Sequence, residues 1–416
     1  MTLNEEIELL CSNASAASVK LALASTEKKN ELLLHIADAI EERAEEIYTA
    51  NAEDLSAASE NGVPKPMIDR LALDPLKIKG ICESLREVVK LPDPIGSGEE
   101  WVRPSGISIS HIRVPLGVVA IIYEARPNVT VDSAALCLKT GNAVVLRGGK
   151  EAIKTNTALV EIMKEVLDNC GFDTHCIELV RSTERESAQI LMTMRKYIDV
   201  LIPRGGKGLI KSVVENATVP VIETGAGNCH IYIDDTADID MAVNVAINAK
   251  CSRPSVCNAV ETMLVHAGIA PKFLPAFAAE AQKNGLEIRG CAKTRVLIPS
   301  ASEASDEDWS TEYNDLILAV KVVDTLSDAI SHINKYSTGH SEAIITQTGE
   351  NAERFLREVN SAAVYVNAST RFTDGGEFGY GAEIGISTQK LHVRGPMGLT
   401  ALTTEKYLIH GNGNIR

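Results

Sequence analysis

The amino-acid sequence predicts an α/β protein made of two doubly wound domains and a small additional β element. Short apolar runs rich in β-branched residues alternate with stretches of helical spacing, which is typical of buried parallel strands joined by helical crossovers. This series occurs twice along the chain. The length of 416 residues also favours two or three domains over a single core.

The first hundred residues are predicted to be helical, and the first sheet follows them. Between residues 26 and 52, leucine and isoleucine recur at helical spacing among Glu and Lys. The period changes in residues 101–113, where Ile107 and Ile109 alternate with polar residues, and this predicts one strand of a projecting hairpin. The predicted strands of the first sheet are residues 117–125, 143–149, 176–182, 200–206, 219–225 and 230–235, with helices at 154–169 and 184–195.

A second series begins near residue 239 and predicts a second domain of similar architecture. Its predicted helices are residues 239–249, 270–284 and 326–335, and its predicted strands are residues 262–265, 316–323, 343–347 and 363–368. Residues 367–399 are rich in glycine and polar side chains, and we expect a long functional loop there.

Composition excludes several classes of partner and site. The formal net charge of −15 argues against nucleic acid or an anionic membrane as the main partner, because both require a basic surface. No apolar run reaches the roughly 18 residues of a membrane helix, and the acidic N-terminus does not resemble a signal peptide. The nine cysteines are scattered, without a CxxC pair or a zinc-ligand spacing. We therefore expect no metal site, no disulfide framework and a cytoplasmic location.

Two similar glycine pairs are the first candidate for ligand binding. The segments RGGK at 147–150 and PRGGKG at 203–208 each place two glycines between a predicted strand and a helix. Glycine lets the backbone approach a phosphate and a helix N-terminus attracts anions, so the pairs indicate nucleotide binding. Either pair alone is equally well explained as a turn, because the GxGxxG fingerprint is missing. The candidate cofactor-binding residues are Arg147, Gly148, Gly149, Lys150, Arg204, Gly205 and Gly206.

The charges beside the first glycine pair favour NADPH over NADH. An acidic residue at such a strand end suits the free ribose hydroxyl of NAD, whereas a basic residue accommodates a 2′-phosphate. Arg147 and Lys150 are both basic. The competing explanation is that these two are solvated surface charges.

Cys257 is the candidate nucleophile. It follows a helical stretch and Pro254, and it precedes a further predicted helix, whose amides would favour the thiolate. Most cysteines in a set of nine are inert buried groups, and Cys251 and Cys229 are weaker alternatives.

Two more polar residues are candidates for catalysis. Glu223 ends the run VPVIE beside glycines, which suits an acid or base, and Asn128 in YEARPNVT suits an amide donor to a developing oxyanion. Helix capping and turn formation are the competing explanations. No metalloprotease, Walker, kinase or nucleophile-elbow motif occurs.

Together these segments resemble the aldehyde dehydrogenase superfamily. PLGVVAIIYEARPN is similar to its first nucleotide-domain strand and oxyanion asparagine, and Cys257 follows the segment ETGAGN in the expected order. GNAVVLRGG is similar to the second strand, with Arg147 where many members have Lys. SRPSVCNAVET, IETGAGNCH and the tail VNASTRFTDGGEFGYGAEIGISTQKLHVRGPMGL resemble one branch, whose members reduce L-glutamate 5-phosphate in proline biosynthesis.

The resemblance implies a chemistry and roles for particular residues. L-glutamate 5-phosphate would be reduced by NADPH to L-glutamate 5-semialdehyde and phosphate through a thioester on Cys257, with Asn128 and the Cys257 backbone N–H stabilising the oxyanions. Glu312, in the altered motif Glu312-Tyr313-Asn314, is carried over as a cofactor contact. The role of Glu223 stays open, because an acyl-phosphate reductase needs no base that activates water. The candidates for holding the substrate's phosphate or carboxylate are Arg371, Lys390 and Arg394.

The resemblance also implies an aldehyde-dehydrogenase-like domain organisation. An NADPH-binding domain would comprise residues 1–99, 114–228 and 368–387, a catalytic domain residues 229–367, and a small β oligomerisation element residues 100–113 and 388–416. A homo-oligomer is implied, and a glutamate kinase that delivers the labile acyl phosphate is a candidate partner.

Two other functions are compatible with these residues. One is a hydrolytic NAD(P)-dependent aldehyde dehydrogenase, which would not require inorganic phosphate in the oxidative direction. The other is a catalytically silent binding protein on the same fold, which failure to bind a nicotinamide cofactor would indicate.

Overall fold

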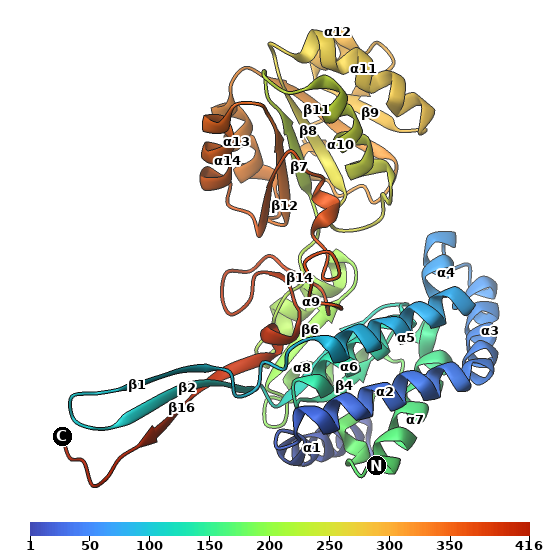
Figure 1. Cartoon of the computed structure of the whole chain (residues 1–416). Helices are drawn as coiled ribbons and strands as arrows, with labels where there is room; N and C mark the ends of the chain where they lie inside the picture. Colours follow the sequence, from blue (N-terminus) through green and yellow to red (C-terminus); the bar gives the residue numbers. More distant parts are fainter. The chain divides into compact units, whose positions relative to one another are not determined.

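The computed structural model describes the backbone of residues 1–416 and the side chains of all residues except 65 and 66. The chain divides into two compact units. Unit 1 comprises Met1–Thr224, Gly379–Gly385 and Met397–Arg416, and unit 2 comprises Gly225–Phe378 and Ile386–Pro396. Each unit contains a parallel sheet between helices, so the predicted doubly wound α/β class is confirmed (Figure 1).

Unit 1 is built on a four-stranded parallel sheet in the order β5-β4-β3-β6. The strands are β3 (Val118–Tyr123), β4 (Ala143–Arg147), β5 (Ile177–Leu179) and β6 (Val200–Arg204). Because β3 pairs with both β4 and β6, the chain reverses its direction across the sheet beside β3. Ligands of open α/β sheets bind at the carboxyl ends of the strands at such a switch point. The segments that follow β3 and β6 are therefore the expected ligand edge.

Helices cover both faces of this sheet. Val118, Ala120 and Ile122 point to the face covered by α1 and α8, while the alternate residues of β3 point to the face covered by α6 and α7. The helices of unit 1 are α1 (Leu3–Leu21), α2 (Thr26–Glu42), α3 (Ala44–Glu60), α4 (Lys65–Leu71), α5 (Pro75–Lys90), α6 (Pro127–Lys139), α7 (Ile153–Asn169), α8 (Arg185–Thr193) and α9 (Lys207–Asn216).

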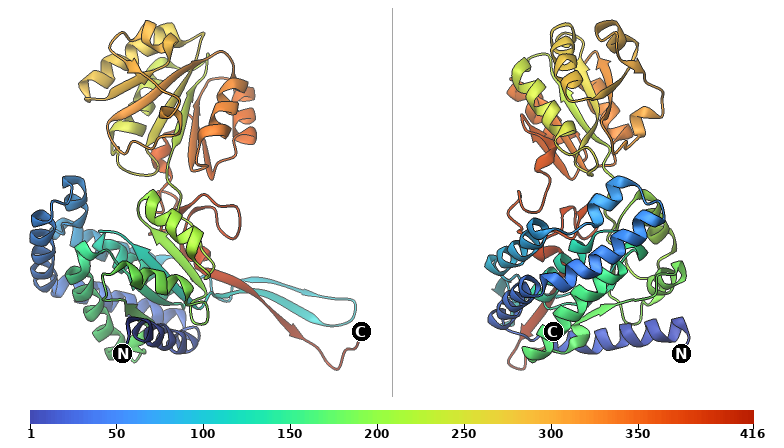
Figure 2. Two further views of the ribbon diagram at one scale, coloured as in Figure 1. Left: turned by 180° about the vertical axis from the view of Figure 1, so that it is seen from behind. Right: turned by 90° about the vertical axis from the view of Figure 1, so that its right-hand side faces the viewer.

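A separate antiparallel sheet projects from unit 1 (Figure 2). Its order is β1-β2-β16, with β1 (Gly98–Val102) and β2 (Ser108–Pro115) forming a hairpin and β16 (Thr403–His410) completing it. The pairing of β16 with β2 runs from Thr403 opposite Pro115 to His410 opposite Ser108. The strand expected within 101–113 is therefore the second strand of a hairpin that the C-terminal segment extends.

Unit 2 is built on a seven-stranded parallel sheet in the order β10-β9-β11-β8-β7-β12-β13. Ile231 and Ile233 face the buried cluster of α10 and α11, and Tyr232 faces that of α13 and α14. The strands are β7 (Cys229–Ile233), β8 (Val260–His266), β9 (Glu287–Gly290), β10 (Ser302–Glu303), β11 (Ile317–Val323), β12 (Ser341–Ile345) and β13 (Ala363–Val366). The helices are α10 (Ile239–Cys251), α11 (Ala270–Lys283), α12 (Ala292–Leu297), α13 (Leu326–Tyr336) and α14 (Gly349–Glu358).

Several local expectations differ from the structure. The strand expected at 230–235 in the first sheet is β7 of the unit 2 sheet. Residues 219–225 contribute one bridge, between Val221 and Leu201, in place of a full strand, since Pro220 has no N–H to donate. The boundary between the units falls after Thr224, so residues 225–228 belong to unit 2 and not to the expected segment 114–228 of the other domain. Residues 368–378 also belong to unit 2, because Asn258 donates hydrogen bonds to main-chain oxygens of this segment.

A buried ion pair in unit 1 provides a test of its packing. The Lys29 ammonium lies 2.5 Å from the Asp93 carboxylate, and both side chains are almost fully buried. Burial acts to raise the pKa of Asp93, but the hydrogen bonds from Lys29, the Ile95 amide and the Thr26 hydroxyl outweigh it, and the pKa is lowered.

Replacing Lys29→Met should lower the free energy of unfolding at pH 7 by about 3–5 kcal/mol, because a buried carboxylate loses its cation. The exposed neighbour Lys28 gives a matched control, and Lys28→Met should change the free energy of unfolding by less than about 0.5 kcal/mol. The stability that Asp93 contributes is present above its unfolded pKa of about 3.9 and is lost as the pH falls through the lower folded value. Urea denaturation should therefore show the Lys29→Met deficit shrinking below about pH 4, and an unchanged deficit at that pH would contradict this assignment.

Candidate functional site

The amino ends of the parallel strands in unit 2 gather several chain segments around Cys257. Because these strands all run in one direction, the segments that precede β7, β8, β11 and β12 lie at the same edge of the sheet. They are residues 225–228, 252–259, 311–316 and 337–340. The site therefore lies at the amino edge of the unit 2 sheet, whereas ligands of open sheets usually bind at the carboxyl edge.

Cys257 is half-buried, and it lies in the loop between α10 and β8. The predicted helix after Cys257 is wrong, because the chain enters β8 three residues later. The amides of a following helix therefore cannot favour the thiolate at this position.

A half-buried guanidinium, that of Arg371, is held on the loop of Cys257. Arg371 contacts the Asn258 Oδ1 atom and donates to the Ser252 hydroxyl at 3.3 Å, so it is fixed to the loop that carries Cys257. Burial and the neighbouring Arg253 lower the pKa of Arg371, whereas Asp374 and the sulfur of Cys257 favour its charged form. The same attraction favours the ionised form of Cys257.

The main chain of Cys257 packs directly against Gly227. A Cβ atom on Gly227 would lie 1.5 Å from the Cys257 carbonyl oxygen and 2.6 Å from its Cα, so only glycine fits. The Gly227 N–H donates to the Glu312 carboxylate at 2.7 Å, and the Cys229 thiol donates to the Cys257 carbonyl at 3.1 Å. Glu312, expected as a cofactor contact, therefore also holds the segment beneath the nucleophile.

Asn258 ties the Cys257 loop to the segment that follows β13. Its Nδ2 atom donates to the carbonyl oxygens of Arg371 at 3.3 Å and Thr373 at 2.9 Å, and its own carbonyl accepts from the Thr370 hydroxyl at 2.7 Å. Asn258 is almost completely buried. These bonds hold the Arg371 side chain on the same loop as the cysteine.

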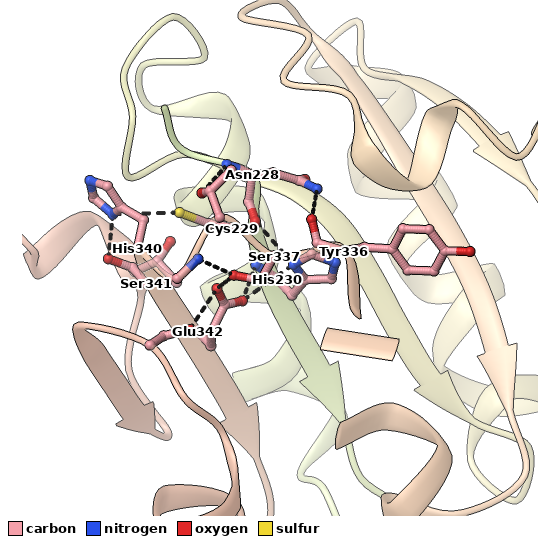
Figure 3. A network of polar contacts seen from close by, with 12 residues as sticks. Asn228, Cys229, His230, Tyr336, Ser337, His340, Ser341 and Glu342 are labelled. Carbon is pink, nitrogen blue, oxygen red and sulfur yellow. Dashed lines mark hydrogen bonds and ion pairs between the residues drawn. The ribbon is translucent and has the colours of Figure 1, made fainter. Parts of the chain in front are cut away.

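A buried polar network fixes the start of β7 (Figure 3). The Glu342 carboxylate accepts from the His230 amide at 2.6 Å and from the Ser337 hydroxyl at 2.5 Å. Asn228 donates through Nδ2 to the Tyr336 carbonyl at 2.9 Å. Because Gly227 directly precedes these residues, the network fixes the surface on which Cys257 rests.

Other cysteines are less suited to act as the nucleophile. Burial raises the pKa of Cys251, and it raises that of Cys229 well above its usual range. For Cys291, hydrogen bonds involving Thr294 and the Val322 amide outweigh burial and lower the pKa of the thiol. Cys291, however, follows the carboxyl end of β9, on the opposite edge of the sheet from Cys257.

In unit 1 three of the four glycines of the two pairs pack closely against neighbouring atoms at the carboxyl ends of the strands. A Cβ atom on Gly205 would lie 2.6 Å from the Glu124 carboxyl carbon, one on Gly149 3.3 Å from the Ala125 nitrogen, and one on Gly148 2.2 Å from the Asn156 Nδ2. Gly206 precedes α9, and its N–H donates to the Glu124 carboxylate at 2.9 Å. The second pair therefore lies at the switch point between β3 and β6.

The basic residues beside the glycines differ in how far their side chains are buried and hydrogen-bonded within the unit. Arg147 donates to the carbonyl oxygens of Thr183 at 3.0 Å and Glu184 at 2.9 Å, and burial lowers its pKa. Arg204 lies 3.9 Å from the Glu383 carboxylate, and its Nε has no partner among the described side chains and main chain. Lys150 is exposed.

The remaining candidates lie in both units. Asn128 is exposed in the first turn of α6 in unit 1. Glu223, also in unit 1, is half-buried between two residues that are hydrogen-bonded to β6. In unit 2, Lys390 is exposed and Arg394 donates to the Asn360 carbonyl at 3.0 Å, so Arg371 alone of the three basic candidates is seen holding the Cys257 loop among the described residues.

Sequence reasoning missed the residues that support the nucleophile. The most important are Gly227, Asn258, His230 and Glu342. The signal for Gly227, His230 and Glu342 is the density of polar residues in IETGAGNCH and TGHSEA, at the edges of apolar strands, which has no explanation in packing alone.

A family model identifies the architecture around this site. The model described as the aldehyde dehydrogenase family matches residues 2–296 and 297–382. The chain belongs to the aldehyde dehydrogenase family. Within the described residues of this family member, no helix is long and apolar enough to cross a membrane, and no group of three His, Cys, Asp or Glu side chains is placed to hold a metal.

Relatives place the chain in one branch of the aldehyde dehydrogenase family. It is 55% identical over 412 residues to the gamma-glutamyl phosphate reductase of Caldanaerobacter subterraneus subsp. tengcongensis, covering 99% of this chain and 100% of the relative. It is 57% identical over 413 residues to that of Carboxydothermus hydrogenoformans, again covering 99% and 100%.

Solved structures agree with this placement. The crystal structure of the gamma-glutamyl phosphate reductase of Thermotoga maritima matches with a TM-score of 0.95 at 48% identity, over 98% of this chain and 99% of that one. An acetylating aldehyde dehydrogenase of Geobacillus thermoglucosidasius matches with a TM-score of 0.73 at 18% identity, over 100% and 98%, and shares the fold. The predicted aldehyde-dehydrogenase-like fold is confirmed.

Replacing Gly227→Ala should disturb the nucleophile directly, because the new methyl group must displace the Cys257 main chain. We expect the free energy of unfolding to fall by about 1–3 kcal/mol and the alkylation of Cys257 by iodoacetamide to slow about tenfold, as the sulfur moves away from Arg371. Peptide mass spectrometry measures the alkylation. Gly349→Ala is the control, since nothing lies within 4 Å of a Cβ there. An unchanged rate in Gly227→Ala would show that the contact does not position the thiol.

Proposed function

We propose that this family member reduces L-glutamate 5-phosphate to L-glutamate 5-semialdehyde and phosphate with NADPH, as a step of proline biosynthesis. The observation that carries the proposal is the half-buried Cys257 on a loop that also holds the Arg371 cation. The names of the full-length relatives support the substrate, and they favour it over the hydrolytic alternative.

The first step is attack of the Cys257 thiolate on the acyl carbon of the substrate. A free carboxylate resists nucleophiles because it is an anion, whereas an acyl phosphate has a good leaving group. A carbon–sulfur bond forms, the bond between the acyl carbon and the phosphate oxygen breaks, and phosphate leaves with the bonding electrons. The product is a thioester on Cys257.

Both tetrahedral species in this reaction carry an oxyanion. We assign the Cys257 backbone N–H and the Asn128 amide as its donors, as the family resemblance implies. Removing one such donor typically costs a factor of 10² to 10³ in kcat. Glu223 has no required role here, because the thioester is not hydrolysed.

The carboxyl edge of the unit 1 sheet suits a dinucleotide. The switch point and the amino end of α9 are the features that accept phosphates, while Glu124 packs against Gly205 and accepts from the Gly206 N–H. When bound there, a nicotinamide cofactor supplies the hydride that reduces the thioester to a thiohemiacetal, which then releases the aldehyde.

The preference for NADPH rests on the first glycine pair. Arg147 is occupied by carbonyl oxygens, so the exposed Lys150 is the cation that we assign to the 2′-phosphate. Glu312, whose carboxylate accepts from the Gly227 N–H, is assigned as a cofactor contact, as the family resemblance implies. Arg147, Gly148, Gly149 and Arg204 are assigned to shaping this edge.

The anionic groups of the substrate need cations near Cys257. We assign Arg371 to the phosphate or the α-carboxylate, because it is held on the loop of the nucleophile. Lys390 and Arg394, on the same unit, are assigned to the other anionic group.

The projecting sheet supports an oligomer. Trp101, Val102, Tyr407 and Ile409 expose large apolar surfaces on β1 and β16, which would be unfavourable in a monomer. We propose a homo-oligomer formed through this sheet, the roles of NADPH-binding domain for unit 1 and catalytic domain for unit 2, a cytoplasmic location, and delivery of the labile substrate by a glutamate kinase.

Replacing Cys257→Ser should reduce turnover by at least about 10³-fold, because an alcohol lacks the nucleophilicity of a thiolate. NADPH binding, followed by fluorescence titration, should be unchanged. Cys291→Ser and Cys251→Ser are the controls and should retain turnover. Retained turnover in Cys257→Ser together with loss in Cys251→Ser would identify Cys251 as the nucleophile.

Oxidation of L-glutamate 5-semialdehyde should require inorganic phosphate, since phosphate must cleave the thioester in that direction. We expect NADP⁺ reduction, followed at 340 nm, to fall to background without phosphate, and to be slower with NAD⁺ at equal concentration. Comparable rates without phosphate would indicate a hydrolytic aldehyde dehydrogenase. Failure to bind either cofactor would indicate a silent binding protein.

A further inference from the structure

We infer that Asp132 is a positioning residue for the Asn128 amide, an inference that rests on the proposed function. The two residues lie one turn apart at the start of α6, whose first turn begins with Pro127 immediately after the switch point. The spacing of four residues places both side chains on one face of the helix. The Asn128 Nδ2 atom donates to the Asp132 Oδ2 atom over 3.1 Å.

The chemistry of this pair selects one orientation of the amide. An ionised carboxylate can only accept hydrogen bonds, so it turns the nitrogen of Asn128, and not the oxygen, toward itself. The nitrogen carries two hydrogens, and one of them remains available to a substrate oxygen from this exposed side chain. Without the carboxylate the amide can flip, and it would then present its own oxygen to the developing oxyanion. Asp132 would therefore make Asn128 a donor before the substrate arrives.

A carboxylate near an oxyanion would be unfavourable if its charge were not balanced. Burial raises the pKa of Asp132 to about 6, while the hydrogen bonds from Asn128 and Ser84 and the charge of Arg204 favour the ionised form. Arg204 ends β6 and also lies 3.9 Å from Glu383. In unit 1 the positive charge of Arg204 therefore offsets the negative charge of Asp132, and the Asp132 carboxylate orients the Asn128 amide.

The competing explanation is that the pair only stabilises the first turn of α6. Such a role would change folding, and it would act on turnover independently of Asn128. A positioning role acts only through the amide, so its effect must vanish when the amide is absent.

A double-mutant cycle separates these explanations. The variants are Asp132→Ala, Asn128→Ala and both together, assayed by phosphate-dependent NADP⁺ reduction with L-glutamate 5-semialdehyde. We expect Asp132→Ala to lower kcat about five- to tenfold with KM changed less than about twofold, since an amide that can rotate is seldom in the donor orientation. Asn128→Ala should lower kcat about 10²- to 10³-fold, and the double variant should match it.

Two further variants complete the cycle. Asp132→Asn keeps the shape of the side chain but can donate as well as accept, so it should lower kcat only about two- to threefold, and not at all in the Asn128→Ala background. If Asp132→Ala fails to fold, Asp132→Asn replaces it in the double-mutant cycle. Asp168→Ala, the loss of an exposed acid on α7, is the matched control and should leave kcat unchanged. The alkylation rate of Cys257 and the affinity for NADPH should be unchanged in all variants.

Equal effects of the Asp132 substitutions with and without Asn128 would overturn the inference. So would unchanged kcat in both Asp132 variants while Asn128→Ala is impaired. If Asn128→Ala itself keeps full kcat, the oxyanion assignment and the inference both fail, whereas the loss of turnover in Cys257→Ser would still support the thioester chemistry.

Discussion

Unit 2 depends on one close approach, that of the Cys257 main chain to Gly227. No side chain fits at position 227, so the loop of the nucleophile lies directly on the segment that leads into β7. The surrounding hydrogen bonds serve this contact. Glu312 holds the Gly227 amide, and Glu342 and the His230 amide fix the strand that follows. A thiol that must meet an acyl carbon at bonding distance tolerates little movement, and the reaction therefore depends on this packing.

Local charge decides the chemistry in a protein whose net charge is −15. Arg371 is bound to Asn258 and Ser252 and is half-buried, so solvent weakens its field less than that of a surface residue. It favours the Cys257 thiolate, and in our proposal it also attracts the phosphorylated substrate. An acidic surface and a basic site are thus compatible, because the relevant interactions extend over a few ångströms.

Unit 1 also depends on glycines that allow close packing, but at the carboxyl edge of its sheet. Gly149 and Gly205 allow the ends of β4 and β6 to pack closely against residues 124–125, beside the switch point between β3 and β6. Arg147 is engaged by carbonyl oxygens within the unit, so we assign phosphate recognition to the amides at the start of α9 and to the exposed Lys150. The first turn of α6 starts at the same switch point, and this places the Asn128–Asp132 pair beside the expected cofactor edge.

The two parallel α/β units, the projecting hairpin strand and the family could be predicted from the sequence, because hydrophobic periodicity and long motifs are local properties of the chain. The sequence also singled out Cys257, Asn128 and Arg371. Long-range packing determines that residue 257 precedes a strand and not a helix, that residues 219–225 form a single bridge, and that the C-terminal strand joins the hairpin. The support of Cys257 by Gly227, Asn258 and Glu342 was not predicted. Gly227 and Glu342 lie 30 and 85 positions from residue 257, and Asn258 bonds to residues 113 and 115 positions away. Their contacts arise because parallel strands bring distant segments to one edge, which no local pattern encodes.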